Sequence, residues 1–99
     1  MSARDFPPIH PGEILLEEFL QPLGMSEHQL AKDTSVPVLR IVEIVGGKGS
    51  ISTDTALRLG RYFGIVAQFW LSLQSRYDLL AAEQALSTRL DHEVRPHAA

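Results

Sequence analysis

The chain has 99 residues with a net charge of −3, 44% apolar residues and 21% charged residues. This length and balance predict one compact soluble domain with a modest core. No run approaches the roughly eighteen apolar residues of a membrane span. The chain has no cysteine, which excludes disulfides and thiolate metal sites and agrees with a cytoplasmic protein.

The cations gather in the middle third of the chain. Residues 25–62 carry five Lys or Arg against four acids, whereas the segments on either side are net acidic. This is a weak basic region, but it is the part of the chain that favours contact with phosphate.

The first predicted helix opens at Pro11-Gly12, because proline is tolerated in a first helical turn. Pro22 is expected to end it and Gly24 to make the turn. The second helix carries a capping box, in which the Ser26 hydroxyl caps the helix and Gln29 reaches back to it. It stops before Pro37, since the residue before proline is pushed out of the helical region.

Three further helices complete an all-α fold. The third runs from about Val38 to Val45 and stops at two glycines. Ser52 caps the fourth, which Gly64 ends. The fifth is long, from about Ala67 to Leu86, and its entry at Ile65-Val66 lacks an N-cap side chain. Trp70 and Tyr77 follow its apolar stripe, so we interpret them as core residues rather than a base-stacking pair.

The second and third helices are joined by a tight turn and form a helix-turn-helix candidate, whose second helix would lie in the DNA major groove. With Ile41 at the centre of the buried face, a step of about 100° per residue places Val38, Ile44 and Val45 within about 60° of it. The outward face then holds Leu39, Val42, Glu43 and Gly46, with Arg40 on its flank.

These positions give the candidate DNA-binding residues. Arg40 is the best candidate for reading bases, and Lys48 in the following loop for phosphate. The others are Gln29, Pro37, Leu39, Val42, Glu43 and Thr53. Four of these residues also have an ordinary structural interpretation: Gln29 and Thr53 as capping residues, and the two cations as solvated surface charges.

The sequence also resembles a known family over about residues 10–80. The resemblance rests on His10-Pro11-Gly12-Glu13, Pro22-Leu23-Gly24-Met25-Ser26, Val36-Pro37, Arg61-Tyr62-Phe63-Gly64 and Phe69-Trp70-Leu71-Ser72-Leu73-Gln74-Ser75-Arg76-Tyr77-Asp78-Leu79. These stand in the order seen in the HigA antitoxins, also called virulence-associated protein I, of the lambda-repressor-like group.

The resemblance implies a five-helix domain that forms a homodimer, binds double-stranded operator DNA and represses its own gene. It also implies binding to a partner toxin, typically a RelE-like mRNA endonuclease, and no catalytic site, cofactor or small-molecule substrate in the antitoxin itself. A stand-alone transcriptional regulator and a scaffold acting through protein contacts are the alternatives.

The sequence departs from the family at the recognition helix. Leu39 and Val42 are apolar where relatives commonly carry polar residues, and Thr34-Ser35 replaces the usual apolar-Gly turn. One hypothesis is weak DNA binding with a preference for T-rich sites, because an apolar side chain contacts a thymine methyl. The other is that this apolar patch contacts a protein.

The remaining predictions concern the ends of the chain. Residues 1–9 are expected to form an N-terminal extension, residues 10–86 the domain and residues 87–99 a flexible tail. Leu79, Leu80 and Leu86 exceed what one small core needs and are expected to form a dimer seam, with packing back onto the first helix as the alternative. His10 and Glu13 have helical spacing but no third ligand, so no metal site is expected and His10 is assigned to the helix entry.

Overall fold

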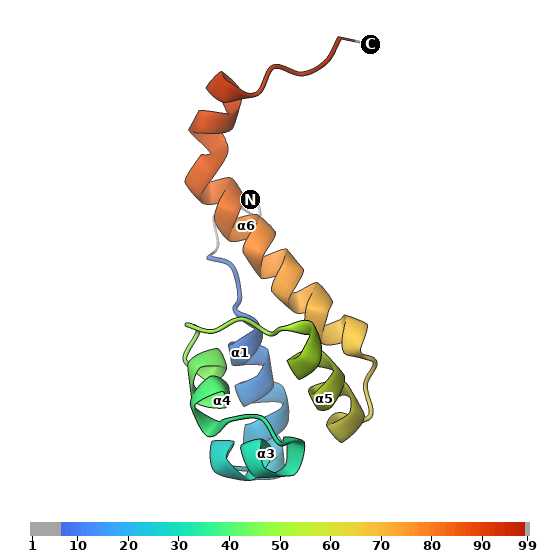
Figure 1. Ribbon diagram of the computed structural model, residues 1–99. Helices are drawn as coiled ribbons and strands as arrows, with labels where there is room; N and C mark the ends of the chain where they lie inside the picture. The colour runs from blue at the N-terminus through green and yellow to red at the C-terminus, as the bar shows by residue number, and fades with distance from the viewer. Residues whose placement is uncertain (1–6, 99) are drawn as a thin grey trace.

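A computed structural model of the chain describes residues 7–98, and within that range it is helical without any strand. Residues 1–6 of the expected N-terminal extension, and Ala99 of the expected tail, lie outside the described residues. The helical segments are α1 (Pro11–Ile14), η2 (Leu15–Leu20), α2 (Gln21–Leu23), α3 (Glu27–Thr34), α4 (Val38–Val45), α5 (Thr53–Phe63) and α6 (Ala67–Glu93). The first three run on as one helix, so the predicted five-helix fold is confirmed (Figure 1).

The N-terminal helix begins as expected but passes through Pro22. His10 caps it, because its Nδ1 accepts a 2.9 Å hydrogen bond from the Gly12 N–H. The prediction that Pro22 ends the helix is wrong. A wide π-helical stretch precedes the proline, in which the Gln21 N–H donates to the Leu16 carbonyl, and the helix continues to Leu23. Proline lacks the N–H of an α-helical bond and crowds the preceding turn, and a wider turn relieves that conflict.

The core lies where the shorter helices meet the start of α6. Its fully buried side chains include Leu15, Leu30, Ile41, Ile44, Leu59 and Trp70. The Trp70 ring packs against Phe19 and Phe69, with centroids 5.0 and 5.1 Å away, which confirms its interpretation as a core residue. The half-buried Tyr77 ring meets the His10 ring edge-on at 4.7 Å, so Tyr77 braces the helix entry.

Helix α6 packs against α5 at its start and then leaves the body of the molecule (Figure 1). Its entry has no side-chain cap at Val66, as predicted. Its predicted end at Leu86 is wrong, because the helix continues to Glu93 and includes an Arg89–Glu93 ion pair of 3.2 Å. The last buried side chain along α6 is Gln74, so its C-terminal half projects as a single helix.

Candidate nucleic-acid interface

Helices α3 and α4 form the predicted helix-turn-helix. The Ser26 Oγ accepts a 3.0 Å hydrogen bond from the Gln29 N–H, which confirms the predicted cap of α3. Ser35 then takes a left-handed conformation with φ 58°, and the Val36 N–H donates to the Ala31 carbonyl across the turn. A non-glycine residue there is strained, by about 1–2 kcal/mol. The structure therefore accepts the Thr34-Ser35 turn at a cost in stability.

The bounds of α4 match the predicted Val38–Val45, and its faces divide largely as predicted. Ile41 and Ile44 are fully buried, whereas the side chains of Leu39 and Val42 are 67% and 42% exposed. Arg40, Glu43 and Gly46 are exposed as well. The predicted outward face of the recognition helix is thus confirmed.

Val38 is an exception, because the helical period predicts it on the buried side, whereas its side chain is 38% exposed. The centre of the buried face lies between Ile41 and Ile44 rather than on Ile41. At about 100° per residue, Val38 is then about 90° from that centre and Val45 about 70°. Val38 therefore joins the exposed apolar side of α4, while Val45 stays half-buried.

The Gln29 side chain does not complete a capping box. Its Nε2 donates a 2.7 Å hydrogen bond to the Asp33 carboxylate one turn further along α3. That acceptor is charged, which makes the bond stronger than one between neutral groups. The Gln29 side chain is therefore bonded to Asp33 instead of reaching back to Ser26. To contact a phosphate as well, its amide would have to serve both Asp33 and the phosphate.

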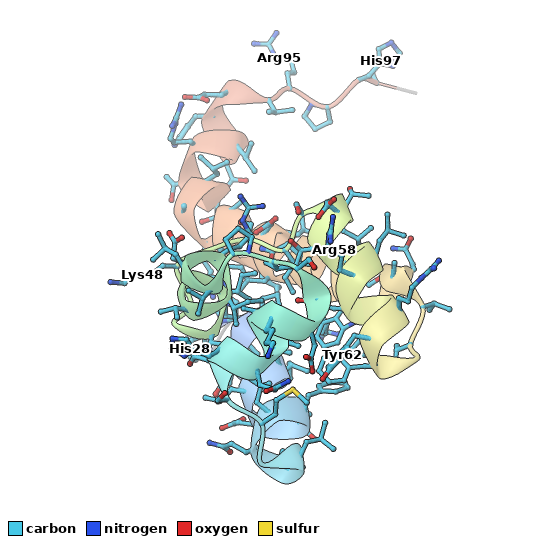
Figure 2. All side chains as sticks on the ribbon, turned by 60° about the horizontal axis from the view of Figure 1, so that its bottom comes forward. His28, Lys48, Arg58, Tyr62, Arg95 and His97 are labelled. Carbon is cyan, nitrogen blue, oxygen red and sulfur yellow. The ribbon has the colours of Figure 1, made fainter. Side chains whose placement is uncertain are left out.

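Lys48 lies in a short loop that closes on the end of α4. The N–H groups of Lys48 and Gly49 both donate to the Glu43 carbonyl at 2.9 Å. The Lys48 side chain itself extends away from the body of the molecule (Figure 2). The backbone of this cation is thus fixed directly behind the recognition helix, while its side chain is exposed.

Gln74 anchors the same loop, a role that its neighbouring residues do not indicate. Its Oε1 accepts a 2.8 Å hydrogen bond from the buried Ile51 N–H, and its Nε2 donates to Asp78 at 2.9 Å. Gln74 and Ile51 are 23 residues apart in the sequence, so no local sequence pattern predicts this hydrogen bond. Gln74 thereby ties the segment between α4 and α5 to α6.

Pro37 and Thr53 occupy the starts of two helices. Pro37 is the exposed N-cap residue of α4 and forms no side-chain cap. Thr53 is the exposed first residue of α5, and the cap there is the neighbouring Ser52, whose Oγ accepts from the Thr55 N–H at 3.2 Å. The predicted Ser52 cap is confirmed, and Thr53 has no capping duty. The DNA contacts of Pro37 and Thr53 stay predictions.

Helix α5 clamps α3 through two side chains that the sequence did not single out (Figure 2). The Arg58 Nη1 donates to the Thr34 carbonyl at 3.0 Å, beside the strained turn. The Tyr62 hydroxyl donates to the Asp33 carboxylate at 2.5 Å. Hydrogen bonds from Gln29 and Tyr62 lower the pKa of Asp33, and the bond to Asp33 raises the pKa of Tyr62.

Gly12 lets the N-terminal helix approach the back of α4 closely. A Cβ at Gly12 would meet the backbone of Ile44 and would lie 2.6 Å from its carbonyl carbon. Only glycine permits this contact without a shift of one helix. The position of the recognition helix thus depends on the Gly12 of the His10-Pro11-Gly12 motif.

The predicted dimer residues lie on the projecting part of α6. Leu79 is 60% exposed, and Leu79, Leu86 and Leu90 lie within about 40° of one another around the helix. Leu80 is about 100° away from Leu79 and lines a cleft with Pro8. The three predicted residues therefore do not share one face, and the dimer stays a prediction.

Metal-binding clusters and membrane-spanning helices are both absent from the described residues. Between residues 7 and 98, no cluster of three or more His, Cys, Asp or Glu side chains has a geometry that holds a metal. Over the same residues, no helix combines the length and apolar character needed to cross a membrane.

Comparison of the sequence with known proteins identifies the family. No protein-family model matches the chain. Virulence-associated protein I of Dichelobacter nodosus is 58% identical over 83 residues, which is 84% of this chain and 77% of that protein. Antitoxin HigA-1 of Vibrio cholerae is 32% identical over 72 residues, 73% of this chain and 68% of that one. The chain belongs to the HigA-like family of helix-turn-helix antitoxins.

Solved structures of this family share its fold. The Pseudomonas aeruginosa antitoxin HigA, solved with the higBA promoter, has a TM-score of 0.89 and 45% identity, covering 92% of this chain and 99% of that one. The antitoxin GraA, solved in complex with its operator, has a TM-score of 0.89 and 38% identity, covering 95% of each chain. The HigA-like chain thus has the fold of antitoxins whose structures contain DNA.

Proposed function

We propose that this chain is the antitoxin of a type II toxin–antitoxin pair. It binds operator DNA as a dimer through α4, represses its own operon and neutralises a RelE-like mRNA endonuclease. The observation that carries the DNA-binding part is the exposed outward face of α4, held as the second helix of a helix-turn-helix. The promoter and operator complexes of HigA and GraA support this part.

Two kinds of contact would hold the DNA, one to base edges and one to phosphates. Arg40 lies on the flank of the outward face of α4 and forms no ion pair within the described residues, so its guanidinium is free for a guanine edge. Lys48, Thr53 and Gln29 would contact phosphate, which fixes register without reading sequence. Pro37 is the N-cap residue directly before α4 and would set where its first turn enters the groove.

The DNA-binding test is a fluorescence-anisotropy titration against the DNA upstream of the gene and a scrambled duplex, at low and physiological salt. Arg40→Ala is expected to weaken binding to the upstream DNA about 5- to 100-fold and to narrow the preference over the scrambled duplex. Arg61→Ala is the matched control, because it removes an exposed cation from the far end of α5. Equal binding of the two duplexes by the unaltered chain would overturn sequence-specific repression.

The dimer is supported by the leucines on the projecting part of α6, where Leu79 is exposed, Leu86 is half-buried on the same face and Leu80 lies to the side. Sedimentation should show a dimer that Leu79→Glu converts to monomer, since a buried unpaired charge opposes association. Leu57→Glu is the control, because Leu57 is equally exposed but lies on α5. A monomer in the unaltered protein would refute this part.

The toxin is the part that separates the proposal from its main alternative. The alternative is a stand-alone regulator, and the Escherichia coli relative YbaQ, 33% identical over 82 residues, is named only as an HTH-type transcriptional regulator. Co-expression with a neighbouring short basic open reading frame should give a stable complex, and the free partner should cleave mRNA on ribosomes. A chain that represses its gene but has no such partner would instead be the stand-alone regulator.

A further inference from the structure

The outward face of α4 is divided into an apolar half and a charged half. Val38, Leu39 and Val42 are exposed side by side, at about 260°, 0° and 300° around the helix when Leu39 is set at 0°. Glu43 and Arg40 follow at about 40° and 100° on the other side. Single exposed apolar residues need no explanation, but three together mark a surface that meets something apolar.

The major groove offers one apolar feature on its base edges, the C5-methyl group of thymine. We infer that Leu39 and Val42 are specificity-determining residues that read thymine methyl groups in the operator. This inference rests on the proposed DNA-binding function and adds the base that the apolar half of α4 selects. Arg40 and Glu43, on the charged half, would face the neighbouring base pair.

The spacing of the two residues suits adjacent thymines. Three residues of helix rise about 4.5 Å, and successive bases on one strand are about 3.4 Å apart. The separation of Leu39 and Val42 along the helix axis therefore corresponds to between one and two base steps. The burial of Ile41 and Ile44 behind them holds α4 in place, so that the apolar half is presented as a fixed surface.

DNA suits this surface better than a protein partner. The apolar half is on the second helix of a helix-turn-helix, which in that motif enters the major groove. Related chains of 45% and 38% identity with the same fold were solved with promoter or operator DNA. Glu43 borders the apolar half, Arg40 lies beyond it on α4, and Lys48 follows α4 in the next loop; both cations are without an ion-pair partner in residues 7–98.

The test removes only the methyl group. A duplex with high affinity is selected from a random pool, and its thymines are replaced one at a time by uracil. Burying one methyl is worth about fourfold in affinity, so uracil at a contacted position should weaken binding about fourfold in each half-site. In Leu39→Ala or Val42→Ala the corresponding uracil effect should vanish. In Leu57→Ala, an exposed leucine on α5, it should persist.

The outcomes separate the two proposals. If no duplex is selected above background, the proposed DNA-binding function fails, and the inference fails with it. If the selected duplex binds tightly but uracil replaces every thymine without loss, DNA binding stands and the thymine readout is overturned. If Leu39→Lys then abolishes binding to a protein partner while DNA affinity is unchanged, the apolar half is a protein-contact surface and the inference is wrong.

Discussion

Replacing Gly12 by alanine tests whether one contact positions the recognition helix. In an exposed helix this change stabilises the helix by roughly 0.5–1 kcal/mol, because glycine loses more entropy on folding. Here the new Cβ would lie 2.6 Å from the Ile44 carbonyl carbon and 3.0 Å from the Val45 Cα, whereas ordinary contacts begin at 3.4 Å. The nearest obstructing atom is the Ile44 carbonyl oxygen, which the new Cβ would overlap outright, so the helices must separate by more than the 0.8 Å, from 2.6 to 3.4 Å, that the carbonyl carbon alone requires.

The expected loss of folding stability depends on the packing that this shift disturbs. The obstructing atoms belong to the backbone of α4, so no side-chain rotation relieves the clash. Moving α4 away from α1 loosens the packing of the fully buried Ile41 and Ile44. Overpacking costs typically 1–3 kcal/mol, and the loss of close packing around two isoleucines adds to it, so we expect Gly12→Ala to cost about 3 kcal/mol or more. For a domain of this size that lowers Tm by about 12–24 °C.

The assay is urea unfolding followed by circular dichroism, with Gly46→Ala as the matched control. Gly46 is exposed at the end of α4 with a negative φ of −77°, and a Cβ there would lie 3.2 Å from the Val42 carbonyl oxygen, only slightly inside ordinary contact, so its replacement should change stability by less than about 1 kcal/mol. A loss below about 1 kcal/mol in Gly12→Ala, or an equal loss in both variants, would refute the close-approach argument.

Three further predictions concern the supports of α3 and α4. Ser35→Gly should stabilise the protein by about 0.5–1 kcal/mol in urea unfolding, because glycine adopts the left-handed turn without strain; a loss would contradict this. Gln74→Ala should cost about 1–3 kcal/mol in the same assay, since it leaves the buried Ile51 N–H unpaired, and an unchanged midpoint would refute it. The lowered pKa of Asp33 gives stability that is present above the ordinary carboxyl pKa near 3.8 and lost as pH falls through the lower folded value. Unfolding measured between pH 2 and 6 should therefore depend less on pH in Asp33→Asn, and less also in Tyr62→Phe; equal slopes would contradict this.

Features that depend on neighbouring residues could be predicted from the sequence. The Ser26 and Ser52 caps, the Val38–Val45 helix and the Gly64 end each follow from a few adjacent residues, and each is present. The exposed face of α4 also followed, because it needs only the helical period and one buried reference residue. The family resemblance supplied the fold and the expected partners, which periodicity alone did not.

Features that depend on distant residues could not be predicted. The Gln74–Ile51 and Tyr62–Asp33 hydrogen bonds join residues that are 23 and 29 positions apart in the sequence. Asp33 also accepts the hydrogen bond from Gln29, which holds the Gln29 side chain away from the Ser26 cap. The passage of the helix through Pro22 depends on a wide turn that has no sequence signal. The long C-terminal end of α6 was missed because an exposed single helix needs no apolar period.

The few cations at the interface determine how this chain must recognise DNA. Affinity from phosphate contacts scales with the number of charges neutralised, with a slope of about −0.9 in log K against log salt per contact. In the proposed complex each protomer would bring Arg40 and Lys48 to the DNA, and Glu43 is exposed on the same helix as Arg40, in a chain of net charge −3. The non-specific term is therefore small, and a single recognition helix would bind poorly at physiological salt. If the proposed dimer forms through the projecting helix α6, it would supply a second recognition helix, and a larger share of the affinity would come from base contacts. An apolar half on α4 is suited to that need, because a methyl contact adds affinity only at the correct base and is little weakened by salt.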